Sequence, residues 1–95
     1  MIPVVVSVQH GEGHRLHLTF DDGTEGDVDV AQLVPFVGVF EALQDLAEFR
    51  RVRVDAELGT VAWPGGADLD PLVLYAEVRG VEVDELFAVK SADQD

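Results

Sequence analysis

The sequence predicts an α+β fold: a three-stranded antiparallel meander, then a helix, a β-hairpin and a second helix, packed in two layers. The early part of the chain consists of short β-branched or alternating runs separated by glycine-containing turns. Residues 39–49 carry apolar side chains at helical spacing. Two prolines, two adjacent glycines and two acids between Trp63 and Pro71 specify a fixed turn that leaves a strand and enters a helix.

The first three strands follow from alternation and turn chemistry. Residues 4–8 are mostly valine, and residues 16–20 alternate apolar with polar side chains after a turn containing two glycines. Gly23 suits the positive φ of the next tight turn. Residues 24–30 alternate again, which predicts a meander with one face toward water. The acids of the third strand share that face: Glu25, Asp27 and Asp29.

The helical part begins after the meander. Residues 31–33 are expected to form a short helical turn that ends at Pro35. Residues 39–49 are then expected to form the first full helix, since their apolar positions recur every three or four residues.

A second hairpin and a second helix complete the predicted fold. Residues 51–55 alternate as a strand, and residues 60–63 return as its partner. Asp70 stands at the position of an N-cap, with Pro71 at the first helical position, and the helix is expected to stop at Gly80.

Length and composition limit the domain organisation. Ninety-five residues, 47% of them apolar, predict one compact domain over residues 1–80 and a C-terminal extension over residues 81–95 with a frayed end. No cysteine is present, which excludes disulfides and thiolate chemistry. The longest apolar stretch is far shorter than the roughly 20 residues of a membrane span. Without signal-peptide features at its start, the chain is expected to be cytoplasmic.

Charge is the strongest functional constraint. The formal net charge of −13 repels nucleic acids and anionic lipid, so we expect neither partner. Arg50, Arg51 and Arg53 are too few for a nucleic-acid footprint. They are expected to neutralise acids on neighbouring strands or to cap a helix C-terminus, and the alternative is an anchor for an acidic partner.

The order of several segments carries a family resemblance. These segments are Phe20-Asp21-Asp22-Gly23, Val28-Asp29-Val30 and Trp63-Pro64-x-Gly66-x-Asp68-Leu69-x-Pro71-x-x-Leu74-Tyr75. Together they resemble the small bacterial family called domain of unknown function 2442, over residues 4 to about 78. The resemblance implies the same order of strands and helices and no catalytic residue. Stand-alone relatives are often encoded beside another small protein, in an arrangement similar to toxin and antitoxin pairs.

Sites for metals and nucleophiles are poorly supported by the sequence. His10, His14 and His17 could suggest zinc, but turn and exposed-face positions explain them better. The clustered aspartates do not match a calcium loop. Neither Ser7 nor Ser91 lies in a nucleophile elbow. We therefore predict no catalytic residue, no metal and no cofactor.

Two function classes follow. The first is a non-enzymatic protein-interaction module that uses its acidic face or a sheet edge to bind a protein partner of basic character, encoded nearby. The second is a small-ligand binder or enzyme with a shallow site near Trp63, Asp68 and Tyr75. A homodimer through an open strand edge is compatible with either class. The candidate contact residues are Trp63, Asp68, Tyr75, Asp27 and Asp29.

Overall fold

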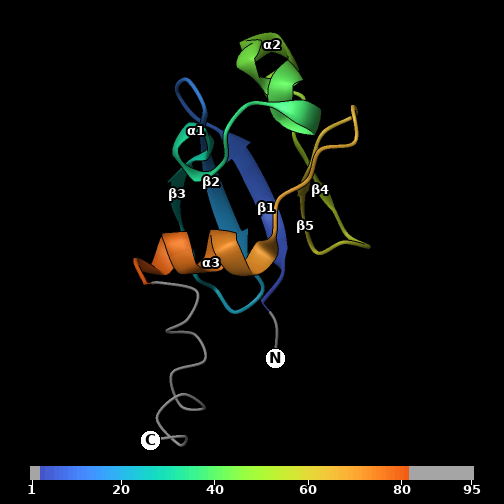
Figure 1. The fold of residues 1–95 in the computed structure, drawn as a ribbon. Coiled ribbons are helices and arrows are strands. Elements are labelled where there is room, and N and C mark those ends of the chain that lie inside the picture. Colours follow the sequence, from blue (N-terminus) through green and yellow to red (C-terminus); the bar gives the residue numbers. More distant parts are fainter. Residues whose placement is uncertain (1–2, 82–95) are drawn as a thin grey trace, which may run out of the picture.

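The computed structural model describes residues 3–81 and confirms the predicted α+β class (Figure 1). Strands β1 (Val5–His10), β2 (Arg15–Phe20) and β3 (Glu25–Asp29) form an antiparallel sheet in the order β1-β2-β3. Strands β4 (Arg53–Asp55) and β5 (Thr60–Ala62) form a separate antiparallel hairpin beside β1. The predicted meander and second hairpin are both present.

Helix α3 (Pro71–Arg79) begins and ends as the sequence predicts. The Asp70 carboxylate accepts a hydrogen bond from the backbone N–H of Leu72, and Pro71 occupies the first turn. Gly80 ends the helix in the left-handed conformation, with φ at 72°. In Figure 1 this helix lies across the lower part of the three-stranded sheet.

The prediction of a single helix over residues 39–49 is wrong. The segment divides into a 3₁₀ helix, η1 (Gly38–Gln44), and a short helix, α2 (Leu46–Phe49). Asp45 separates them because its backbone is extended and its side chain accepts a hydrogen bond from the N–H of Ala47. A short acidic side chain competes in this way with helical hydrogen bonding, and it favours a cap over a helix interior.

Two predicted strands are shorter than expected. Helix α1 (Val30–Leu33) takes Val30 out of the third strand, since Asp29 caps this helix through the N–H of Ala31. The strand expected over residues 51–55 starts only at Arg53. Arg51 still belongs to the turn that leaves α2, where its N–H donates to the carbonyl of Glu48.

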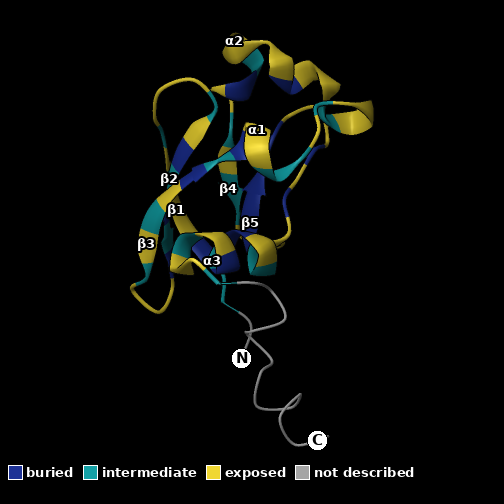
Figure 2. Cartoon of the chain, turned by 60° about the vertical axis from the view of Figure 1, so that its left-hand side comes forward, coloured by how far each residue is buried: buried dark blue, intermediate teal, exposed yellow. Residues whose placement is uncertain are grey.

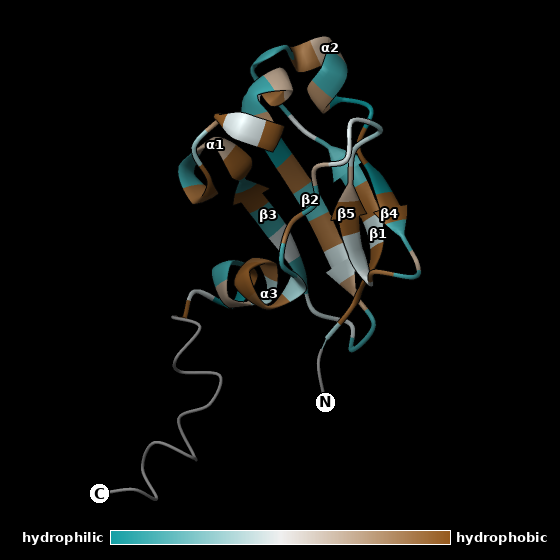
Figure 3. Cartoon of the chain, turned by 45° about the vertical axis from the view of Figure 1, so that its right-hand side comes forward, coloured by the Kyte–Doolittle hydropathy of each residue, from teal (hydrophilic) through white to brown (hydrophobic). Residues whose placement is uncertain are grey.

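The core lies between the inner face of the three-stranded sheet, helix α3 and the second hairpin. Leu16, Leu18 and Phe20 of β2 are at most 1% exposed, and Trp63 is 2% exposed. The Trp63 indole N–H donates to the Phe49 carbonyl at 2.8 Å, which satisfies its polar atom in the core. Figure 2 shows buried residues alternating with less buried ones along β2, and Figure 3 shows the matching bands of hydropathy.

The extension predicted over residues 81–95 lies outside the described residues except for Val81. The N–H of Val81 donates to the carbonyl of Ala76, which completes the C-terminal cap of α3.

Gly26 provides a test of the contact between β3 and α3. A Cβ atom at this position would lie 2.9 Å from Cγ1 of Val78, a stiff side chain packed against the core. We expect Gly26→Ala to lower the free energy of unfolding by about 1–3 kcal/mol, measured by urea denaturation. Val78→Ala in the same chain should recover part of this loss.

Gly65→Ala is the matched control for this substitution. A Cβ atom there meets nothing within 4 Å, and its φ is not positive. The free energy of unfolding should change by less than about 0.5 kcal/mol. Equal effects at Gly26 and Gly65 would contradict the close contact between Gly26 and Val78.

Candidate functional site

The outer face of the three-stranded sheet is polar and carries exposed charges. Ser7 and Gln9 of β1, Arg15 of β2, and Glu25 and Asp27 of β3 are all exposed. In β2 the alternate residues point to the core, because side chains alternate between the two faces of a sheet, whereas in β1 Val6 is also exposed, at the register irregularity between Val5 and Ser7. The prediction of a wet face on the meander is therefore confirmed.

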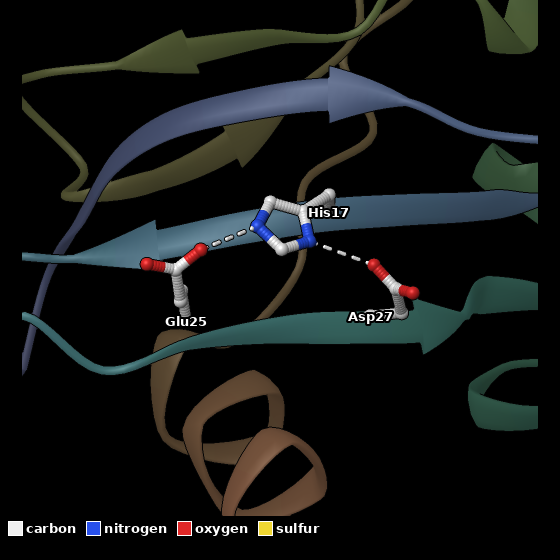
Figure 4. A network of polar contacts seen from close by, with 3 residues as sticks. All are labelled: His17, Glu25 and Asp27. Atoms are coloured by element: carbon white, nitrogen blue, oxygen red, sulfur yellow. Dashed lines mark hydrogen bonds and ion pairs between the residues drawn. The ribbon is translucent and has the colours of Figure 1, made fainter.

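His17 stands at the centre of this face, between two carboxylates (Figure 4). Its Nδ1 lies 2.7 Å from Oδ1 of Asp27, and its Nε2 lies 2.9 Å from Oε1 of Glu25. Strand register explains the geometry. His17 is directly opposite Asp27, and Glu25 is the diagonal neighbour, two residues back along β3. We refer to His17, Glu25 and Asp27 as the acidic cluster.

The two contacts of His17 favour its charged form. A ring with both nitrogens facing carboxylates can donate two hydrogen bonds only as an imidazolium. Hydrogen bonds to Asp27, and then to Glu25, accordingly raise the pKa of His17 above its ordinary value. When His17 is protonated, the cluster consists of one cation and two carboxylates, so its net charge is negative whether the ring is charged or neutral.

An open depression of about 700 Å³ adjoins the acidic cluster. Its lining includes Gln9, Glu12 and Arg15 beside His17 and Asp27. The lining carries charges of both signs and comes from strand and turn residues that are mostly exposed or half-buried. Enclosed apolar cavities are typical of small-molecule sites, so this shape favours contact with another polar surface.

The three residues of the predicted ligand site differ in burial and in the residues they contact. Trp63 is buried against Phe49, with ring centroids 5.6 Å apart, whereas Tyr75 packs edge-on against Phe20 at 5.0 Å. Asp68 has an exposed side chain, and its backbone bridges to Ala62. Tyr75 lines a small depression of about 110 Å³ beside Pro3, and neither Trp63 nor Asp68 lines this depression or the larger one.

Tyr75 instead belongs to a polar contact that the sequence did not reveal. Its hydroxyl donates to Oδ2 of Asp22 at 2.6 Å and accepts from Arg79 at 3.1 Å. The Tyr75 hydrogen bond, followed by the bond from the Thr24 N–H, lowers the pKa of Asp22. Tyr75 and Asp22 are 53 positions apart, so no local pattern could have indicated this pair.

The remaining candidate residues have structural partners. Asp29 caps α1, as described above. Nε2 of His14 lies 2.7 Å from the Leu43 carbonyl oxygen. The His14 ring packs between Phe36 and Phe49. The ring of His10 lies on the opposite face of β1 from Gln9 and packs edge-on against Phe49. His10 and His14 thus both pack against Phe49, whereas His17 lies between two carboxylates on the outer face of the sheet. Within residues 3–81, no group of three or more potential ligands has the arrangement of a metal site.

Helices of the described segment are short, and none has the length and apolar character needed to cross a membrane.

Titration of His17 tests the acidic cluster. Asp27→Asn should lower the pKa of His17, and Glu25→Gln should lower it less, because the hydrogen bond to Asp27 is the larger cause of the raised value. Proton NMR of the imidazole signals measures both effects. A His17 pKa that neither substitution changes would contradict the geometry of Figure 4.

The same contacts predict a pH dependence of stability. A raised histidine pKa stabilises the fold fully below the unfolded value of about 6.5, and the contribution is lost as pH rises through the folded pKa. The melting temperature should therefore fall more steeply above pH 6.5 in the natural chain than in His17→Gln. Parallel curves for the two proteins would show that the cluster contributes nothing to stability.

Comparison with known proteins identifies a family without assigning an activity. No curated protein and no solved structure matches the chain. Residues 5–80 match the family described as "Protein of unknown function (DUF2442)". This match spans the meander, the helical elements α1, η1 and α2, the second hairpin and α3. With most of its length covered, the chain belongs to the DUF2442 family, as the Trp63-to-Tyr75 segment and the order of the earlier pieces predict.

Proposed function

We propose that this domain is a non-enzymatic protein-interaction module that binds a basic segment of another protein at the acidic cluster. The observation that carries the proposal is the exposure of Glu25 and Asp27, whose side chains are 61% and 66% exposed on an edge strand. They belong to a chain with a formal net charge of −13. Such a surface attracts a basic partner and accelerates its association.

Exposure also favours binding over proton-transfer chemistry. A catalytic carboxyl usually owes its working pKa to burial in an apolar pocket. Glu25 and Asp27 have exposed side chains on the outer sheet face, where a cation of the partner can reach them directly. Their contact with His17 fixes where the two carboxylates lie before any partner arrives.

We propose that the partner is a small basic protein encoded beside this one, in an arrangement similar to toxin and antitoxin pairs, acting in the cytoplasm. The family resemblance and the charge of the chain support it.

A small-ligand site near Trp63, Asp68 and Tyr75 is the alternative, and it has weaker support. The Trp63 side chain is buried and its N–H already has a partner. Tyr75 and Asp22, beside the small depression, are the residues through which such a ligand would have to bind.

A pull-down with charge-reversal variants tests the interaction proposal. The tagged chain is recovered from its native host in low and in moderate salt, and bound proteins are identified by mass spectrometry. We expect a basic protein that dissociates as salt rises, since exposed charges are screened. Glu25→Lys with Asp27→Lys should weaken its binding by on the order of tenfold, equivalent to about 1.4 kcal/mol.

The control is Glu41→Lys with Glu57→Lys, which changes the net charge equally at two exposed acids outside the sheet face. This variant should retain the partner. If both double variants lose the partner equally, overall charge explains the binding and the acidic cluster is not the binding site. A chain that retains no protein at either salt concentration would also contradict the proposal.

A further inference from the structure

Strand β3 forms one edge of the three-stranded sheet. Among residues 3–81 it pairs with β2 alone, and β1 forms the opposite edge, where the second hairpin adjoins it. An edge strand presents unpaired backbone N–H and C=O groups, to which an extended segment of another chain can bind.

The hydrogen bonds of β3 show which of its backbone groups face outward. The Phe20 N–H donates to Thr24 at 2.8 Å, and the Val30 N–H donates to His14 at 2.9 Å. These bonds mark the two ends of the β2–β3 ladder. Because hydrogen-bonded pairs alternate in an antiparallel ladder, Gly26 and Val28 also face β2. The backbone groups of Glu25 and Asp27 therefore point away from the sheet.

The backbone groups and the carboxylates of Glu25 and Asp27 can therefore contact the same added strand. Glu25 and Asp27 have outward-facing N–H and C=O groups at the edge, which no described strand pairs, and carboxylates on the outer face. A residue paired directly opposite Asp27 on an added antiparallel strand would place its side chain on that same face, about 5 Å away. A lysine or arginine there could contact the carboxylate while its backbone pairs with Asp27.

We propose that the partner binds by adding an antiparallel strand to β3, with lysine or arginine at alternate positions opposite Glu25 and Asp27. The inference rests on the proposed function and specifies how the basic segment is recognised. Antiparallel pairing continues the pattern of the existing sheet and is the more stable arrangement per residue. The added strand is short, since β3 spans five residues and α1 begins at Val30.

Charge selects a basic segment over the chain's own acidic ones. A second copy paired through β3 would bring the acids of one edge against the acids of the other, and directly opposed like charges destabilise a strand pair. Residues 82–95 carry five acids and one lysine, so their charge also opposes this edge. A partner with alternate cations matches both the backbone and the carboxylates.

Amide hydrogen exchange with a defined peptide tests the inference. The probe is a seven-residue peptide of alternating lysine and threonine with blocked ends. At saturation it should slow exchange of the Glu25 and Asp27 amide hydrogens by at least about tenfold, because these N–H groups gain partners. The Gly26 and Val28 amides, already bonded to β2, should change little. NMR of the full chain resolves the four positions.

Two methylated peptides provide controls of identical charge. In the proposed pairing the lysine N–H groups bond to β3, so methylation of the lysine backbone nitrogens should abolish binding. Methylation of the threonine nitrogens, which face away from β3, should leave binding nearly unchanged. Equal binding of the two methylated peptides would overturn strand addition. So would absence of peptide binding at millimolar concentration, or slow exchange of Glu25 and Asp27 in the free chain.

These results separate the inference from the proposed function. A basic partner can bind in a salt-sensitive way and be lost in the charge-reversal variant without protecting the Glu25 and Asp27 amides from exchange. That result would support the interaction module and contradict only strand addition. A host extract that yields no partner at either salt removes the proposed function itself.

Discussion

The rest of the structure depends on the alternation of the central strand β2 between core and water. Leu16, Leu18 and Phe20 are almost fully buried, and the residues between them point to the outer face. A slip of one residue would expose all three apolar side chains and bury Arg15 and His17 instead. The cost of that exchange fixes the register with β3, and the register places His17 opposite Asp27. Core packing and the acidic cluster are therefore two results of one constraint.

Much of the fold could be predicted because the local signals agree with the tertiary structure. Strand alternation, the Gly23 turn and the Asp70-Pro71 cap all specify conformations that their own residues prefer. The break at Asp45 was missed because the apolar spacing of residues 39–49 suits a continuous helix. The segment nevertheless divides at Asp45, because the Asp45 side chain competes with helical hydrogen bonds for the N–H of Ala47.

The candidate site was only partly predictable, for a related reason. Asp27 could be placed on the wet face by alternation, but its contact with His17 depends on the register across the hairpin. The Asp21-Asp22-Gly23 turn carried that information, since a tight turn sets which residues stand opposite each other. Tyr75 and Asp22 meet only because α3 packs back on the sheet, and no pattern along the chain encodes that distance.

The acidic edge of β3 reconciles two opposing demands. An open strand edge invites pairing with any extended chain, and charged side chains along it are one way in which proteins prevent such pairing. Glu25 and Asp27 carry like charges that oppose pairing of this edge with a second copy, yet within residues 3–81 no strand pairs with the outer side of β3. A proline or a bulge would exclude every partner, whereas like charge excludes only acidic ones. Resistance to self-pairing through β3 and the proposed selectivity for a basic segment can therefore arise from the same two carboxylates.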